Sequence, residues 1–143
     1  MTQAFVVGAT GYTGRALVEE LTRRGLPVRA HVRPGSPRLE EWRQRFSALG
    51  AVLDSSPWEQ PALCEALRGG RPELVFALLG TTARRARLEG LSPAQAYDRI
   101  DRGLTLLFLR AVQAAGIRPR FVYLSSLGVR PGVRLPYLRA RLE

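Results

Sequence analysis

The sequence contains no lysine and no asparagine. All 22 basic residues are therefore arginines, and against 12 acidic residues they give a formal net charge of +10. An excess of this size is compatible with binding to nucleic acid or to an anionic surface. The arginines are spread along the whole chain, however, and only Arg84, Arg85 and Arg87 form a tight cluster. We therefore expect the arginines to lie on solvated helix faces in preference to a nucleic-acid interface. The use of arginine without lysine indicates GC-rich coding.

Cysteine and long apolar runs are also scarce. The single cysteine, Cys64, excludes an internal disulfide, has no partners for a metal site, and lies among Leu63, Ala66 and Leu67 of a predicted helix. We expect it to be a small core residue. No apolar run approaches the length that spans a bilayer, and no charged and then apolar leader opens the chain. The sequence predicts a cytoplasmic protein without a membrane partner, built as one domain over residues 1–143.

A glycine-rich turn follows the first apolar run. It reads Gly8-Ala9-Thr10-Gly11-Tyr12-Thr13-Gly14, between the apolar segment 4–7 and an amphipathic segment 15–24. A strand that ends in glycines and continues as a helix places backbone N–H groups and the positive end of the helix dipole where a pyrophosphate can bind. The spacing G-x-x-G-x-x-G differs from the general G-x-G-x-x-G fingerprint. An ordinary glycine-rich turn between a strand and a helix is the alternative interpretation.

Strand-like and helix-like segments alternate along the chain. Short apolar runs predict strands at residues 4–7, 28–32, 51–53, 74–79 and 121–124. Helices are predicted at residues 15–24, 37–49, 61–68 and 93–115. Such alternation predicts an α/β fold with a doubly wound parallel sheet, a single-domain Rossmann fold with about five parallel strands. Its ligand is expected at the carboxyl ends of the strands.

The end of the second predicted strand bears on the choice of cofactor. An acidic residue there accepts the ribose 2′-hydroxyl of NAD, whereas an arginine accommodates the 2′-phosphate of NADP. Here the chain reads Ala30-His31-Val32-Arg33, with Arg38 following, and offers no carboxylate. Arg33 therefore predicts NADP in preference to NAD. His31, the only histidine, is expected to be a packed neutral imidazole.

Together these segments resemble a known family, the atypical short-chain dehydrogenase/reductases, and within it the NmrA-like and Tat-interacting-protein-like branch. The resemblance rests on the turn at 8–14, on Val32-Arg33, on Leu79-Gly80-Thr81-Thr82, on residues 97–101 and on the run 121–128, which reads FVYLSSLG. It covers essentially the whole chain. It implies a Rossmann fold, bound NADP(H), and in active members a Ser-Tyr-Lys catalytic group.

The resemblance also assigns roles to individual residues. The pyrophosphate would be wrapped by residues of the turn, namely Gly8, Thr10, Gly11, Tyr12 and Thr13, with Gly14 closing the motif. Arg33 would bind the adenosine end, and Gly80, Thr81 and Thr82 the middle of the dinucleotide. Ser125 or Ser126 would hydrogen-bond a substrate carbonyl, and Tyr137 would occupy the position of the catalytic tyrosine.

The chain departs from the family at two places. Arg141 stands where the family has its lysine, and a guanidinium can lower the pKa of a tyrosine but cannot relay a proton. The chain also ends at Glu143, where the family continues, which predicts a C-terminal truncation. Two functions therefore stay open: an NADP(H)-dependent oxidoreductase acting on an unknown carbonyl or alcohol, and a non-catalytic redox sensor or interaction module. Whether the protein forms a homo-oligomer is also left open.

Overall fold

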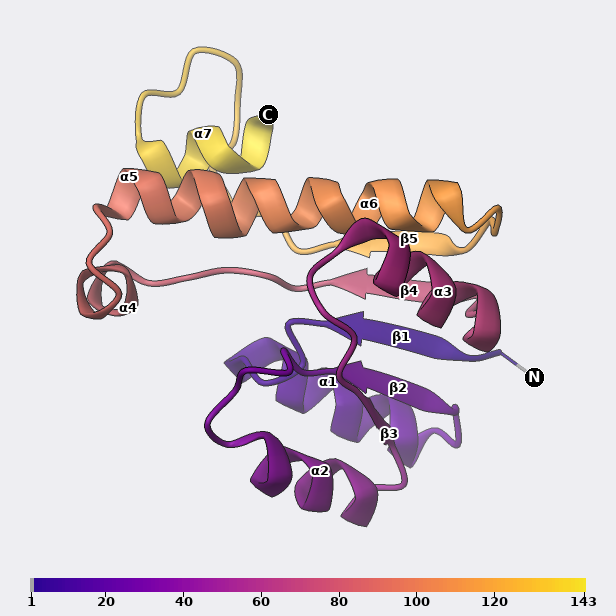
Figure 1. Ribbon diagram of the computed structural model, residues 1–143. Helices are drawn as coiled ribbons and strands as arrows, with labels where there is room; N and C mark the ends of the chain where they lie inside the picture. Colours follow the sequence, from indigo (N-terminus) through magenta and orange to yellow (C-terminus); the bar gives the residue numbers. More distant parts are fainter. Residues whose placement is uncertain (1) are drawn as a thin grey trace.

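Five short strands form one parallel sheet in the computed structural model, which describes residues 2–143. The strands are β1 (Ala4–Val7), β2 (Val28–His31), β3 (Val52–Asp54), β4 (Leu74–Ala77) and β5 (Arg120–Tyr123). Their order in the sheet is β3-β2-β1-β4-β5, and every neighbouring pair is parallel (Figure 1). The chain thus runs outward from β1 to β3, crosses back to β4, and continues to β5. This is the doubly wound arrangement that the sequence predicts.

The helices connect the strands and cover both faces of the sheet. They are α1 (Tyr12–Arg23), α2 (Leu39–Ala48), α3 (Gln60–Gly70), α4 (Ala83–Leu88), α5 (Pro93–Ala96), the π-helix η1 (Tyr97–Leu104), α6 (Thr105–Ala114) and α7 (Pro136–Leu142). Helices α1 and α2 lie on one face, while α3 and α6 pack against each other on the opposite face (Figure 1). Helix α7 lies beside α5 and η1, away from the sheet.

The position of β1 at the centre of the sheet explains why its sequence is apolar throughout. Ala4 and Val6 pack into the core under α1 and α2, whereas Phe5 and Val7 pack into the core under α3 and α6. Because successive side chains of a strand point to opposite faces, a strand covered on both sides needs apolar residues at every position. Cys64 belongs to the second of these cores, as the sequence predicts.

The long predicted helix 93–115 differs from a regular α-helix. It forms as a continuous run of α5, η1 and α6, with eight residues in π conformation between two α-helical pieces. The one residue of η1 that is buried is Asp101. A π segment alters which side chains face the core, and such segments are frequent at functional sites. Sequence periodicity at 3.6 residues per turn cannot show it.

Two smaller differences concern the ends of strands and a short helix. Strand β3 is shifted by one residue from its predicted position, because Asp54 pairs in register with His31 and so belongs to the strand. Helix α4 is absent from the sequence prediction. Its six residues include three arginines and lack an apolar stripe, although Thr82 caps its first turn by accepting a hydrogen bond from the Arg85 backbone N–H at 3.2 Å. No helix within residues 2–143 is long and apolar enough to cross a membrane.

Candidate functional site

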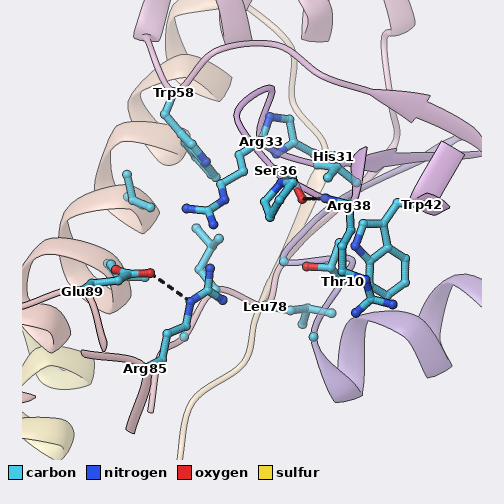
Figure 2. A pocket seen from close by; sticks show the side chains of 18 residues that line it. Thr10, His31, Arg33, Ser36, Arg38, Trp42, Trp58, Leu78, Arg85 and Glu89 are labelled. Carbon is cyan, nitrogen blue, oxygen red and sulfur yellow. Dashed lines mark hydrogen bonds and ion pairs between the residues drawn. The ribbon is translucent and has the colours of Figure 1, made fainter. Parts of the chain in front are cut away.

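A pocket of about 480 Å³ opens at the carboxyl ends of the central strands. Its lining joins three segments that are far apart in the sequence: the glycine turn (Gly8, Thr10, Gly11), the end of β2 (His31, Val32, Arg33) and the end of β4 (Leu78, Leu79, Gly80). Residues of α2, α4 and η1 and the side chain of Trp58 complete the wall. Figure 2 shows the arginine and tryptophan side chains that surround it. The volume lies in the range of ordinary ligand and cofactor sites.

The glycines of the turn have distinct structural requirements. Gly8 has a φ of +78°, and a Cβ added there would lie 2.4 Å from the Leu78 carbonyl oxygen. A Cβ added at Gly14 would lie 2.0 Å from the Gly8 carbonyl oxygen. Both positions are therefore closed to any side chain by the neighbouring backbone. Gly8 therefore lets the turn pass close to the segment after β4, and Gly14 lets the start of α1 pack directly against the segment after β1.

Gly11 differs from the other two glycines. Its φ of −71° and ψ of 169° suit any residue, and the nearest atom to an added Cβ is the Gly8 carbonyl oxygen at 3.4 Å. The protein itself therefore has room for a side chain at Gly11, which lines the pocket. A glycine here leaves the backbone accessible to a ligand, as close approach of a pyrophosphate requires.

The N-terminus of α1 supplies donors beside Gly11. The first helical hydrogen bond that closes on the turn runs from the Arg15 backbone N–H to the Gly11 carbonyl oxygen, at 2.9 Å. The N–H groups of Tyr12, Thr13 and Gly14 precede it and have no acceptor within the helix. No acidic residue occupies the first turn of α1. These donors and the helix dipole fit the phosphate groups of a dinucleotide.

Positive charge dominates the pocket. Three arginines and one glutamate line it: Arg33, Arg38, Arg85 and Glu89 (Figure 2). Arg85 is paired with Glu89 at 3.2 Å. Arg38 donates a hydrogen bond to Glu41 at 2.8 Å and lies 5.1 Å from the centre of the Trp42 ring. Arg33 is exposed just beyond the end of β2. The residue at this position distinguishes the ribose 2′-hydroxyl of NAD from the 2′-phosphate of NADP.

His31 contributes shape to the pocket but no positive charge. Burial lowers the pKa of its imidazole, although the hydrogen bond to Ser56 and the nearby Asp54 act in the opposite direction. Its Nε2 lies 2.8 Å from the Ser56 carbonyl oxygen, so this nitrogen carries the proton and donates it. The ring also contacts the Trp58 ring edge to face, with centroids 4.9 Å apart. The packed neutral imidazole predicted from the sequence is consistent with these contacts.

The loop after β4 contains the other predicted cofactor residues. Gly80 lines the pocket, whereas Thr81 and Thr82 are not among its lining residues. The Thr81 backbone N–H donates to Asp101 Oδ1 at 3.1 Å, and Thr82 serves as the N-cap of α4. In this arrangement Gly80 can contact a ligand directly, while the two threonines hold the loop.

The predicted catalytic residues lie outside this pocket. Ser125 is exposed in the loop after β5, and the Ser126 hydroxyl has one long contact, 3.5 Å to the Leu127 carbonyl oxygen. Tyr137 and Arg141 share one face of α7, as their spacing predicts, with the guanidinium carbon 4.6 Å from the centre of the tyrosine ring. Tyr137 also packs edge to face on Tyr97, at 5.3 Å between ring centroids.

A buried ion pair near the pocket was not predicted from the sequence. Arg141 Nη2 lies 2.9 Å from Asp101 Oδ2, and the two side chains are 4% and 0% exposed. Burial raises the pKa of Asp101 to about 6, while the Arg141 charge and the Thr81 N–H act to lower it. One signal was available in the sequence: Asp101 stands at helical spacing with the apolar Leu104 and Phe108, where a carboxylate must find a partner.

The fold and this pocket define a class, the dinucleotide-binding domains of Rossmann type. Comparison with protein families agrees: the profile of the NAD(P)H-binding family matches residues 8–140. The chain belongs to this family. The match includes the glycine turn, the end of β2 and the loop after β4, which are the three segments that form the pocket.

Three solved structures with the same fold illustrate the range of sequence identity and structural similarity. A proposed epimerase from Burkholderia cenocepacia J2315 is 26% identical, with a TM-score of 0.74 over 99% of this chain and 47% of its own. UDP-glucose-4-epimerase from Stenotrophomonas maltophila, solved with bound NAD, is 19% identical, with a TM-score of 0.74 over 99% and 46%. The protein AtPrR2, solved with NADP+ and (+)pinoresinol, is 22% identical, with a TM-score of 0.65 over 84% and 35%.

The solved structures establish the fold, and the family match establishes NAD(P)H binding. The chain spans about half the length of the two epimerase structures. One of the three structures holds NAD and another NADP+, so fold similarity does not choose between the two cofactors. The family match shows that the chain is an NAD(P)H-binding domain.

Proposed function

We propose that this domain binds NADP(H) in preference to NAD(H), and that it is a cytoplasmic member of the atypical short-chain dehydrogenase/reductases. The observation that carries the cofactor preference is Arg33, an exposed guanidinium at the pocket edge where an NAD-binding domain has a carboxylate. Its planar fork suits a phosphate monoester. Arg38 also lines the pocket, where its guanidinium is paired with Glu41.

The pyrophosphate of the cofactor is assigned to the glycine turn. Gly11 leaves space for it, and the N–H groups of Tyr12, Thr13 and Gly14 supply donors. Thr10 lines the pocket beside them. In this assignment Gly80 contacts the middle of the dinucleotide, and Thr81 and Thr82 fix its loop.

The cofactor preference predicts a specific response to substitution. In a calorimetric titration, NADPH should bind more tightly than NADH, and Arg33→Ala should weaken NADPH binding by roughly tenfold or more while changing NADH binding little. The preference should decrease as salt is added, since it depends on an exposed charge pair.

Arg43→Ala is the matched control. It removes an exposed arginine of α2 that does not line the pocket, and it should leave both affinities unchanged. Equal affinities of the wild-type protein for NADPH and NADH would overturn the NADP(H) preference, as would equal effects of Arg33→Ala and Arg43→Ala.

The chemistry we assign to the family fold is oxidoreduction of a carbonyl or alcohol. A bound nicotinamide supplies or accepts the hydride. Ser125 or Ser126 would hydrogen-bond the substrate oxygen, and the Tyr137 hydroxyl would exchange a proton with it. Arg141 provides a fixed positive charge against the Tyr137 ring but cannot itself accept or release a proton.

A non-catalytic redox sensor or protein-interaction module is the second candidate function. The observation that favours it is that Ser125, Ser126, Tyr137 and Arg141 all lie outside the pocket formed by the cofactor residues. In this function the domain would report the ratio of oxidised to reduced cofactor through binding alone. Turnover with a panel of carbonyl substrates separates the two functions.

A further inference from the structure

The buried ion pair between Asp101 and Arg141 connects two segments that are far apart in the sequence, the loop after β4 and helix α7. Asp101, on η1, uses one carboxylate oxygen for the Thr81 backbone N–H at 3.1 Å and the other for Arg141 Nη2 at 2.9 Å. Thr81 belongs to the loop that carries the pocket residue Gly80, and Arg141 belongs to α7. One carboxylate therefore holds the cofactor loop and the last helix at the same time.

Arg141 extends the connection to the end of β5. Its Nη1 donates to the Leu124 carbonyl oxygen at 2.8 Å and to the Tyr123 hydroxyl at 3.3 Å. The guanidinium also lies directly beneath the pocket wall, because a Cβ added at Gly80 would be 3.2 Å from Arg141 Nη2 and 3.6 Å from Asp101 Oδ2. A movement of α7 must therefore displace the support of Gly80.

The position of helix α7 depends on tertiary contacts, because the helix is short. It has seven residues and packs mainly on η1 and α5, and its Arg141 side chain reaches the end of β5. An isolated helix of this length is unstable in water. Its docking, seen in Figure 1 along α5 and η1, must come from tertiary contacts such as the Asp101–Arg141 pair.

We propose that Asp101 and Arg141 are positioning residues that couple the docking of α7 to the Gly80–Thr81 loop, so that binding of the dinucleotide and docking of α7 stabilise each other. The proposal rests on the cofactor site described under the proposed function. Coupling of this kind is reciprocal: if docked α7 favours binding, bound cofactor favours docked α7 by the same factor. Arg141 thereby acts through the loop and not on a reacting atom.

Hydrogen exchange of the wild-type protein with and without NADPH tests the coupling directly. We expect NADPH to slow exchange of the amides in α7 (Pro136–Leu142) by about fivefold or more, the lower end of typical coupling energies. Helix α7 contributes no residue to the pocket lining, so a ligand confined to that pocket would not protect it by contact. Unchanged exchange in α7 under saturating NADPH would overturn the proposal.

Two substitutions on the same helix provide the matched comparison. Arg141→Met removes the ion pair, whereas Arg139→Met removes an exposed arginine whose ion pair is with Glu143, at 3.5 Å. Arg141→Met should weaken NADPH binding by about fivefold or more and accelerate exchange of the Thr81 amide. Arg139→Met should do neither. Equal behaviour of the two variants would contradict the coupling.

The outcomes distinguish this proposal from the proposed function. If the wild-type protein fails to bind NADPH, the proposed function is wrong, and exchange of the Thr81 amide in Arg141→Met without cofactor still decides whether the pair supports the loop. If NADPH binds but neither α7 nor Thr81 responds, the coupling alone is wrong. Should Arg141→Met not fold, Asp101→Asn replaces it, because the asparagine amide oxygen can still accept the Thr81 N–H while the charge is lost.

Discussion

At the scale of single residues, the three glycines of the turn differ in the space that surrounds them. Gly8 and Gly14 are required by the neighbouring backbone, and Gly11 has space around it. The motif predicts a glycine at all three positions. The positions of the surrounding carbonyl oxygens show that, of the three, Gly11 is the one with room for a Cβ.

This difference predicts unequal losses of stability on substitution. Gly14→Ala should lower the free energy of unfolding by about 2 kcal/mol or more, because its Cβ would overlap the Gly8 carbonyl oxygen. Gly11→Val should cost less than about 1 kcal/mol, chiefly through its effect at the N-cap of α1. Urea denaturation measures both, and a Gly11→Val loss as large as that of Gly14→Ala would contradict the geometric argument.

At the scale of elements, the sequence predicts the strands and long helices and misses what depends on tertiary contacts. Runs such as 4–7 and 74–77 are apolar because both faces are covered, and that pattern is visible in the sequence. Helix α4 has no apolar stripe, and η1 interrupts an otherwise regular pattern, so neither could be recognised.

The candidate site divides in the same way. The glycine turn and Arg33 are predictable because their chemistry lies in adjacent residues. The contributions of Trp58 and Arg85 to the pocket, and the partner of Asp101, depend on segments brought together only by the fold. For this reason the sequence places Arg141 only by its resemblance to the catalytic lysine, and it does not identify Arg141 as the partner of Asp101.

The link between η1 and α7 should also appear in the pH dependence of stability. Burial raises the pKa of Asp101 from 3.8 to about 6, so the folded protein holds this proton more tightly than the unfolded chain. The contribution of Asp101 to the free energy of unfolding is therefore fully present below about pH 3.8 and is lost as the pH rises through about 6.

Asp101→Asn removes this titration and provides the measurement. Between pH 4 and pH 7 the stability of the wild-type protein relative to Asp101→Asn should fall, by at most about 3 kcal/mol. Urea denaturation of both proteins across this range isolates Asp101, because all other groups are shared. A stability difference that stays constant over the range would show that the Asp101 pKa is not raised.

At the scale of the whole molecule, the pocket beside the glycine turn does not include the predicted catalytic residues. The pocket is built from β1, β2 and β4 and their following segments, whereas Ser126 and Tyr137 lie beyond β5 and on α7. The chain spans about half the length of the epimerase structures that share its fold. Binding of cofactor and turnover of substrate can therefore be tested independently in this protein.

We predict negligible dehydrogenase turnover by the 143-residue chain even at saturating NADPH. Arg141 cannot relay a proton, and general acid or base catalysis typically contributes about 10² to 10⁴-fold. Arg141→Lys should restore little, because Tyr137 still lies outside the pocket lining. NADPH oxidation followed optically with a carbonyl panel measures this, and robust turnover that is lost in Tyr137→Phe would establish the enzyme function instead.

The central claim is that the pocket beside the glycine turn binds NADP(H), and the two tryptophans offer a direct measurement. The sequence contains two tryptophans, Trp42 and Trp58, and both line this pocket. Titration with NADPH should quench their fluorescence in a saturable manner in the wild-type protein. In folded Gly11→Val the saturable quenching should disappear, because the valine side chain occupies the space left for the pyrophosphate. Absence of saturable quenching in the wild-type protein, or the same binding curve in Gly11→Val, would contradict the account.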